Sequence, residues 1–195
     1  MNRRLRWSRI PYGRGLLALL IILVVSSEIW TIATPSPIYT RNVIESLGYI
    51  KSRTAEIMLI VGANADWQPS QTADFDREMA EVRKRGQQIA AAFSLIRAAI
   101  DDYSAVTGDD DGVAEISRAS KSMANATGRA YSLQIMRLAA TKNARVTSDG
   151  HVKFTKDEDS RRYENATSDL QTAISAARSA EILISDWVSK RIPAD

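Results

Sequence analysis

Apolar residues recur at alternating intervals of three and four along most of the chain, and this spacing predicts helices rather than strands. Four segments show it, at about 38–62, 72–107, 112–143 and 157–191. In the second segment the seam runs without a missed interval through Phe75, Met79, Val82, Gly86, Ile89, Phe93, Ile96, Ile100 and Tyr103. Short connections favour antiparallel neighbours, so we expect an all-α fold, an up-down-up-down four-helix bundle.

The seams differ in side-chain size. The first is bulky and consists of Val43, Leu47, Ile50, Thr54, Ile57 and Val61. The third and fourth are rich in alanine and consist of Ile116, Ala119, Met123, Ala126, Ala130 and Leu133, and of Tyr163, Ala166, Leu170, Ala173, Ala177, Ala180, Ile184 and Trp187. Small residues facing large ones would fill the core at normal density.

Helix-terminating and capping residues mark the boundaries between these segments. Gly108 is expected to end the second helix, and Asp111 to precede the third. Thr155 and Glu158 have the spacing of a capping box, which predicts the start of the fourth helix. Asp149-Gly150 lies between two short alternating segments, so a small β-hairpin is expected at about 144–155.

The N-terminal part of the chain has a different pattern. Residues 1–14 carry no acidic residue and five arginines, and residues 15–33 form an apolar stretch. We interpret these as a basic cytoplasmic arm and a transmembrane signal anchor. Residues 34–37 contain two prolines and form a linker, and residues 38–195 form the exported bundle domain.

Glu28 leaves a second interpretation of the apolar stretch open. A carboxylate inside a membrane span is costly unless it lies near the interface. Cleavage before Glu28 would instead release the domain as a secreted protein, since Val25-Ser26-Ser27 supplies the small residues of a cleavage site. Apolar residues resume after Glu28, which favours a retained span with Arg14 at its inner and Trp30 at its outer boundary.

The positive net charge belongs to the N-terminal arm. The chain has a net charge of +3, but 21 basic and 22 acidic residues remain beyond Ala33. The arginines of this arm can bind the anionic headgroups of membrane lipids, and we expect no nucleic-acid partner. The chain has no cysteine, which excludes disulfides, thiolate metal sites and cysteine nucleophiles.

Catalytic and cofactor motifs are missing from the sequence. His151 is the only histidine and has no second imidazole or thiol with which to share a metal. Asp109-Asp110-Asp111-Gly112 resembles part of a calcium loop, but Thr107 and Arg118 would occupy its first and last ligand positions, so an acidic turn that caps a helix fits better. We therefore expect no enzyme, no cofactor and no metal.

The predicted topology brings candidate contact residues together at each end of the bundle. Trp67, His151 and Phe154 would lie at the end far from the membrane, as candidates for binding a partner. Trp67 could instead fill the end of the bundle. At the near end Trp187, Lys190 and Arg191 could meet lipid headgroups, together with the interface residues Arg14, Glu28 and Trp30.

These features predict a single-pass protein of the inner membrane, with a cytoplasmic N-terminus and a periplasmic or extracellular bundle. It would act by protein–protein contact, as a scaffold or accessory subunit of an envelope assembly, with a protein partner or a second copy. Three alternatives stay open: an extracytoplasmic sensor of small ligands, a phage-type lysis or envelope-spanning factor, and a secreted helical protein.

Overall fold

The computed structural model describes residues 37–69, 74–147 and 151–192, and these are mostly helical. Their elements are α2 (Pro37–Ala65), α3 (Phe75–Thr107), α4 (Asp110–Thr141), β1 (Arg145–Val146), β2 (Val152–Lys153) and α5 (Asp157–Ser189). The predicted four helices and hairpin are confirmed. By its contacts the chain divides into two units, residues 1–41 and 42–195, and the second contains nearly all of these elements.

The predicted membrane span, residues 15–33, lies outside the described residues. Among the helices that the structure describes, none is long and apolar enough to cross a bilayer.

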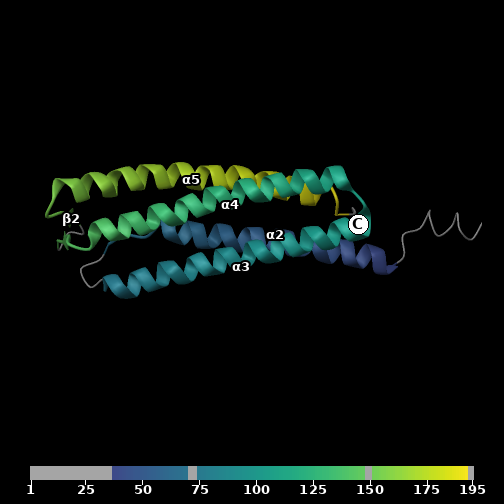
Figure 1. The fold of residues 1–195 in the computed structure, drawn as a ribbon, viewed down its shortest axis with the longest axis horizontal. Helices are drawn as coiled ribbons and strands as arrows, with labels where there is room; N and C mark the ends of the chain where they lie inside the picture. Colours follow the sequence, from purple (N-terminus) through teal and green to yellow (C-terminus); the bar gives the residue numbers. More distant parts are fainter. Residues whose placement is uncertain (1–36, 70–73, 148–150, 193–195) are drawn as a thin grey trace, which may run out of the picture. The chain divides into compact units, whose positions relative to one another are not determined.

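Within the second unit the helices pack as an antiparallel bundle (Figure 1). The end of α2 lies near the start of α3, where Arg85 donates to the side chain of Asn64 at 3.0 Å. The end of α5 lies at the turn between α3 and α4, where Arg191 donates to Asp109. The hairpin lies at the opposite end of the bundle from this turn (Figure 1).

The four predicted seams meet in one apolar core. Fully buried members come from every helix and include Leu47, Ile50, Ile57, Ile96, Ile116, Met123, Leu170 and Ile184. Phe93, which we placed on the seam of α3, is only partly buried and packs against the margin of this core. Ala92 and Ala99, which lie beside the predicted seam, are buried. The buried face of α3 is therefore shifted from Phe93 toward these smaller residues.

The backbones of α4 and α5 approach most closely, and they run side by side (Figure 1). Ala119 and Ala130 on α4, and Ala173 and Ala177 on α5, are buried and short enough to allow this. The backbone of α2 makes few comparably close approaches to the other helices. Its large side chains therefore attach it to the core.

Two predicted helix starts are corrected by the capping contacts. Asp109, not Asp111, caps α4, and its Oδ1 accepts from the backbone N–H of Gly112 at 2.9 Å. The predicted capping box at α5 is wrong, because the hydroxyl of Thr155 donates to the carbonyl of Asn143 across the base of the hairpin. Gly108 ends α3 as expected, with a φ of 63° in the left-handed region that glycine tolerates.

Candidate functional site at the hairpin end

Arg137 lies at the centre of the bundle end that carries the hairpin. It belongs to α4, and only 2% of its surface is exposed. One guanidinium nitrogen donates to the side-chain oxygen of Gln134 at 3.1 Å. The other donates to the carbonyl of Trp67 at 3.2 Å and to the hydroxyl of Tyr163 at 3.4 Å. Arg137 therefore joins α4, α5 and the segment after α2.

Two aromatic rings lie close to this guanidinium. Its central carbon is 5.5 Å from the ring centre of Trp67 and 5.3 Å from that of Tyr163, within the range of cation–π attraction. Phe154, at the end of the hairpin, packs on Tyr163 with ring centres 5.4 Å apart. The hairpin is thereby attached to the bundle, as an isolated two-stranded ribbon requires in water.

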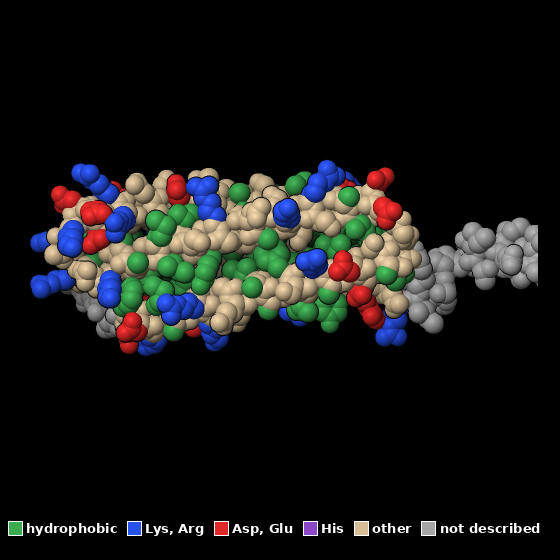
Figure 2. Space-filling model, viewed as in Figure 1, with side chains coloured by type: hydrophobic (Ala, Val, Ile, Leu, Met, Phe, Trp, Pro, Cys, Tyr) green, Lys and Arg blue, Asp and Glu red, His purple; other side chains and the backbone are tan. Residues whose placement is uncertain are grey.

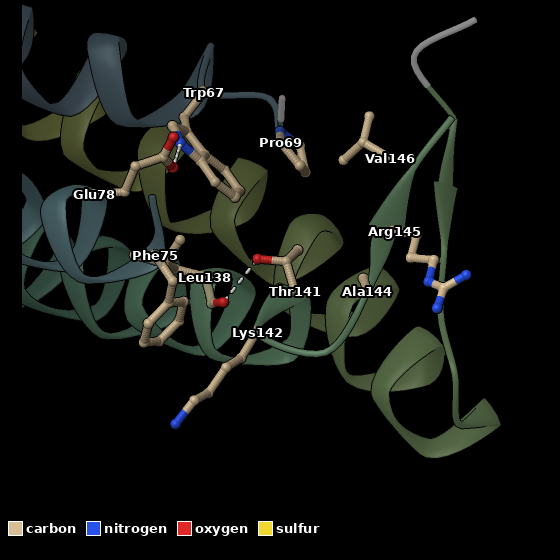
Figure 3. Close-up of a pocket in the computed structure, with 10 residues that line it drawn as sticks. All are labelled: Trp67, Pro69, Phe75, Glu78, Leu138, Thr141, Lys142, Ala144, Arg145 and Val146. Carbon is tan, nitrogen blue, oxygen red and sulfur yellow. Dashed lines mark hydrogen bonds between the residues drawn. The ribbon is translucent and has the colours of Figure 1, made fainter. Parts of the chain in front are cut away.

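Trp67 is half-buried and is held from two directions. Its indole N–H donates to Glu78 of α3 at 2.5 Å, as the dashed line in Figure 3 shows, and its carbonyl accepts from Arg137. Trp67 thus fills the end of the bundle, the alternative that the sequence left open. We call Trp67, Glu78, Gln134, Arg137, Phe154 and Tyr163 the end cluster.

The end cluster buries a positive charge without a direct anionic partner among the residues that the structure describes. Every described salt bridge involves a different arginine. The Nε of Arg137 and the side-chain nitrogen of Gln134 are both buried donors without a hydrogen-bond acceptor. A buried cation and two buried donors without acceptors are costly inside a bundle, so the neutral oxygens and aromatic rings around Arg137 have to stabilise its charge.

A cavity of about 380 Å³ opens beside the end cluster (Figure 3). Trp67, Pro69 and Phe75 line one side of it, and Thr141 and Val146 line another. Glu78, Lys142 and Arg145 also line the cavity, so its walls combine aromatic rings with charged groups and can accept a side chain or small molecule that has both apolar and polar parts. Among the described residues no three acidic, histidine or cysteine side chains gather closely enough to hold a metal ion.

The outer surface of the same end carries charges of both signs, as Figure 2 shows. Its exposed basic residues are Lys142, Arg145, Lys153 and Lys156, and Asp157 and Glu158 at the start of α5 are exposed beside them in sequence. Arg145 and Lys153 are directly opposite each other in the register of the hairpin. Like charges in this position repel, which an acidic partner would relieve.

His151, the third residue predicted at this end, is exposed and lies outside the end cluster. Its carbonyl accepts from the backbone N–H of Thr147 at 2.8 Å and from the hydroxyl of Thr147 at 2.9 Å. These hydrogen bonds extend the hairpin toward its turn. The structure therefore brings Trp67 and Phe154 into one cluster and leaves His151 on the surface.

A second polar cluster closes the opposite end of the bundle. The Oδ2 of Asp109 accepts from Arg191 at 3.2 and 3.3 Å and from the hydroxyl of Tyr103 at 3.3 Å. The N–H of Gly112, and then the guanidinium of Arg191, hold the pKa of Asp109 below its usual value, although burial opposes them. Gly112 has no room for a side chain, because a Cβ there would lie 2.0 Å from Asp109.

The predicted headgroup contacts at this end need correction in part. Trp187 is only 2% exposed, because its ring packs against Tyr103 at 5.1 Å and under Arg191 at 4.2 Å. It is a core residue, as its place on the seam of α5 requires, and has almost no surface for lipid. Lys190 is exposed, and Arg191 is half-buried in its pair with Asp109. Arg14, Glu28 and Trp30 lie outside the described residues.

Arg137 was not predicted, although the sequence carried a signal for it. The seam of α4 alternates intervals of three and four up to Leu133, and the next interval of four falls on Arg137. A charged residue at a core position of a regular seam indicates a polar cluster inside the bundle.

Comparison with known proteins gives no relative. No protein family, curated protein or solved structure matches the chain.

Proposed function

We propose that the protein is a single-pass membrane protein whose bundle lies outside the cytoplasm and acts by protein–protein contact, as a scaffold or accessory subunit of an envelope assembly. One observation carries this proposal. Five arginines, the apolar residues 15–33 and a proline-containing linker directly precede a bundle with a filled core. This order is typical of a signal anchor with a cytoplasmic N-terminus.

The dimensions of the bundle support a role as a spacer. α3 has 33 residues, and at 1.5 Å per residue such a helix is about 50 Å long. The two ends of the bundle are therefore about that far apart, a separation that suits a spacer.

The hairpin end supports a role in binding a partner. It combines a cavity beside the ring of Trp67 with the exposed cations Arg145 and Lys153. A protein segment with one apolar side chain between acidic residues would match both features. His151 is two residues from Lys153 and is exposed on the hairpin, so a crosslinking group at this position would detect a partner bound there.

The test is site-specific photo-crosslinking in intact membranes. A photoreactive residue replaces His151 in one variant and the exposed Ser168, on the side of α5, in a matched control. We expect the first variant to capture a defined set of envelope proteins that the second does not capture. Mass spectrometry should recover the N-terminal peptide intact. A chain that begins at Glu28 and stays in the soluble fraction would contradict the anchored protein, and equal capture by both variants would contradict binding at the hairpin end.

The cavity also favours a second candidate, an extracytoplasmic module that senses a small ligand. Its volume of about 380 Å³ falls within the range of small-molecule sites. A solute that raises the melting temperature of the parent, but not that of a Val146→Trp variant with a filled cavity, would support this candidate. An equal shift in both proteins would place the binding elsewhere and count against it.

A further inference from the structure

One face of α2 exposes large apolar side chains that no described element covers. Leu59 is 76% exposed, the highest value among the large exposed hydrophobic residues, and Ile44 is 44% exposed. The two lie on the same side of the helix as the exposed residues Gly48, Lys51 and Ala55, and as the partly exposed Gly62. These six positions follow intervals of four, three, four, four and three, so they form one stripe. We call them the outer stripe of α2.

No residue that the structure describes packs against the glycines of the outer stripe. A Cβ added to Gly48 or Gly62 would meet no atom within 4 Å. Glycine inside a helix is destabilising relative to alanine, and two such residues in α2 serve no packing purpose in the bundle. Gly86 and Gly112 differ, since side chains fill the space that a Cβ would need at both.

The small residues repeat at the interval that helix pairs use. Gly48, Ala55 and Gly62 are seven residues apart. When two identical helices pack in parallel, a residue at the interface meets the same residue of the other helix, and this repeats every seven residues. Small residues in such layers let two backbones approach, and Ile44 and Leu59 would fill the space between the layers. The stripe is therefore complementary to itself.

We propose that the outer stripe of α2 is a self-association surface on which a second copy of this chain packs its own α2 in parallel. This inference rests on the proposed function, because the anchor decides the direction. Residues 1–36 precede α2, and the predicted span ends only four residues before its first residue, Pro37. Anchors in one membrane would place the same end of every α2 at that membrane and raise the local concentration of the copies.

Lys51 is the one charged residue of the stripe, and in a parallel pair it would meet its counterpart. A single charged layer weakens a helix pair but fixes its register and number of strands. Replacing Lys51 with leucine should therefore raise the dimer fraction. A lower dimer fraction in the Lys51→Leu variant would mean that this layer is not at the interface.

The chain has no cysteine, so single-cysteine variants test the pairing directly. Ile44→Cys and Ala55→Cys place thiols on the stripe of the full-length protein, and Ala91→Cys places one at an exposed alanine of α3 as a matched control. After oxidation of membranes that contain the protein, we expect disulfide-linked dimers at both stripe positions and none at residue 91. Linkage at only one stripe position would exclude the parallel pair. No linkage at either position, or equal linkage at residue 91, would overturn the proposal.

A second pair of variants keeps the test independent of thiol reactivity. Leu59→Glu and Leu183→Glu make the same change at exposed positions of α2 and α5. We expect only Leu59→Glu to convert the detergent-solubilised full chain from dimer to monomer by light scattering. A monomeric parent, or dimers in both variants, would overturn the proposal. Membrane fractionation tests the anchor separately. If the chain is bound to the membrane but forms no crosslinks at the stripe, only the dimer is contradicted. If the chain is found in the soluble fraction, the proposed function is contradicted.

Discussion

Arg137 places a permanent positive charge in the interior of the hairpin end, where it meets the carbonyl of Trp67, the amide of Gln134 and the hydroxyl of Tyr163. The planar guanidinium suits this role because it donates in several directions while its faces stack on aromatic rings. The lysine ammonium also donates in several directions, but it has no planar face that stacks on a ring. The residue therefore organises three segments that are distant in sequence.

Arg137→Ala should lower the free energy of unfolding by roughly 3 kcal/mol, because it leaves buried acceptors unpaired and a space beside two aromatic rings. Arg137→Lys should recover less than half of this loss, since lysine cannot stack and donate at once. Urea denaturation followed by circular dichroism measures both variants. Full recovery by lysine would show that charge alone, and not the guanidinium plane, supports the cluster.

Asp109 links the stability of the opposite end to pH. Its pKa is held below the usual value in the folded chain, first by the N–H of Gly112 and then by Arg191. A lowered pKa contributes stability that is present above the ordinary pKa of an aspartate and is lost as the pH falls through the folded value.

Asp109→Asn keeps a side-chain acceptor for the cap but removes the charge. As the pH is lowered from about 6 to about 2, the unfolding midpoint of this variant should therefore fall less steeply than that of the parent. The stabilities of the two proteins should become more similar in acid. Asp110→Asn is a suitable control, since Asp110 lies in the same turn and is exposed. Parallel pH curves for the parent and Asp109→Asn would contradict the assigned role of Asp109.

At the scale of the elements, the contact between α3 and α4 depends on a glycine. Gly86 lies under the ring of Tyr131, and a Cβ there would lie 2.5 Å from a ring carbon. Gly128 on α4 is exposed, and a Cβ there would meet nothing within 4 Å.

Gly86→Val should destabilise the bundle by roughly 1–3 kcal/mol, because the branched side chain forces Tyr131 away from α3. Gly128→Val should change the stability by less than about 0.5 kcal/mol, as substitutions on an open surface do. Thermal unfolding of both variants provides the comparison. Equal effects would mean that the ring of Tyr131 moves aside without cost.

Most of the helical architecture could be predicted because each seam repeats over many turns, so one misplaced residue does not hide the pattern. The ends of the helices were harder to predict, since each end depends on one or two hydrogen bonds. Three consecutive aspartates can each cap α4, and the left-handed turn at Gly108 favours the first of them, Asp109. Thr155 was expected to cap α5, but it bonds to Asn143 instead, a residue that becomes its neighbour only after the hairpin forms.

The candidate site was predicted only in outline. Trp67 and Phe154 could be placed at the same end because the topology follows from the short connections. Their link through Arg137 was missed, although the seam of α4 leads to this position, because an arginine on a helix is usually solvated and only the packed bundle shows its burial.

At the scale of the whole molecule, residues 42–195 form a compact unit that is separate from residues 1–41. A fragment of residues 37–195 should therefore fold with a melting temperature within about 4 °C of that of the full chain in detergent, which corresponds to less than about 1 kcal/mol in a domain of this size. Calorimetry measures both proteins. A much less stable fragment would show that the N-terminal residues contribute to the folded bundle.

The close approach of α4 and α5 also has a consequence for how the protein reaches its folded state. The most local contacts are those between α3 and α4, which only Gly108 and Asp109 separate, and local contacts form fastest. The closest backbone packing, between α4 and α5, has to wait for the last helix of the chain. The core that α2 joins also contains buried residues of α5, yet α2 leaves the ribosome first. During synthesis the first exported helix must therefore wait, with Leu47, Ile50 and Ile57 exposed, until the last helix has been made.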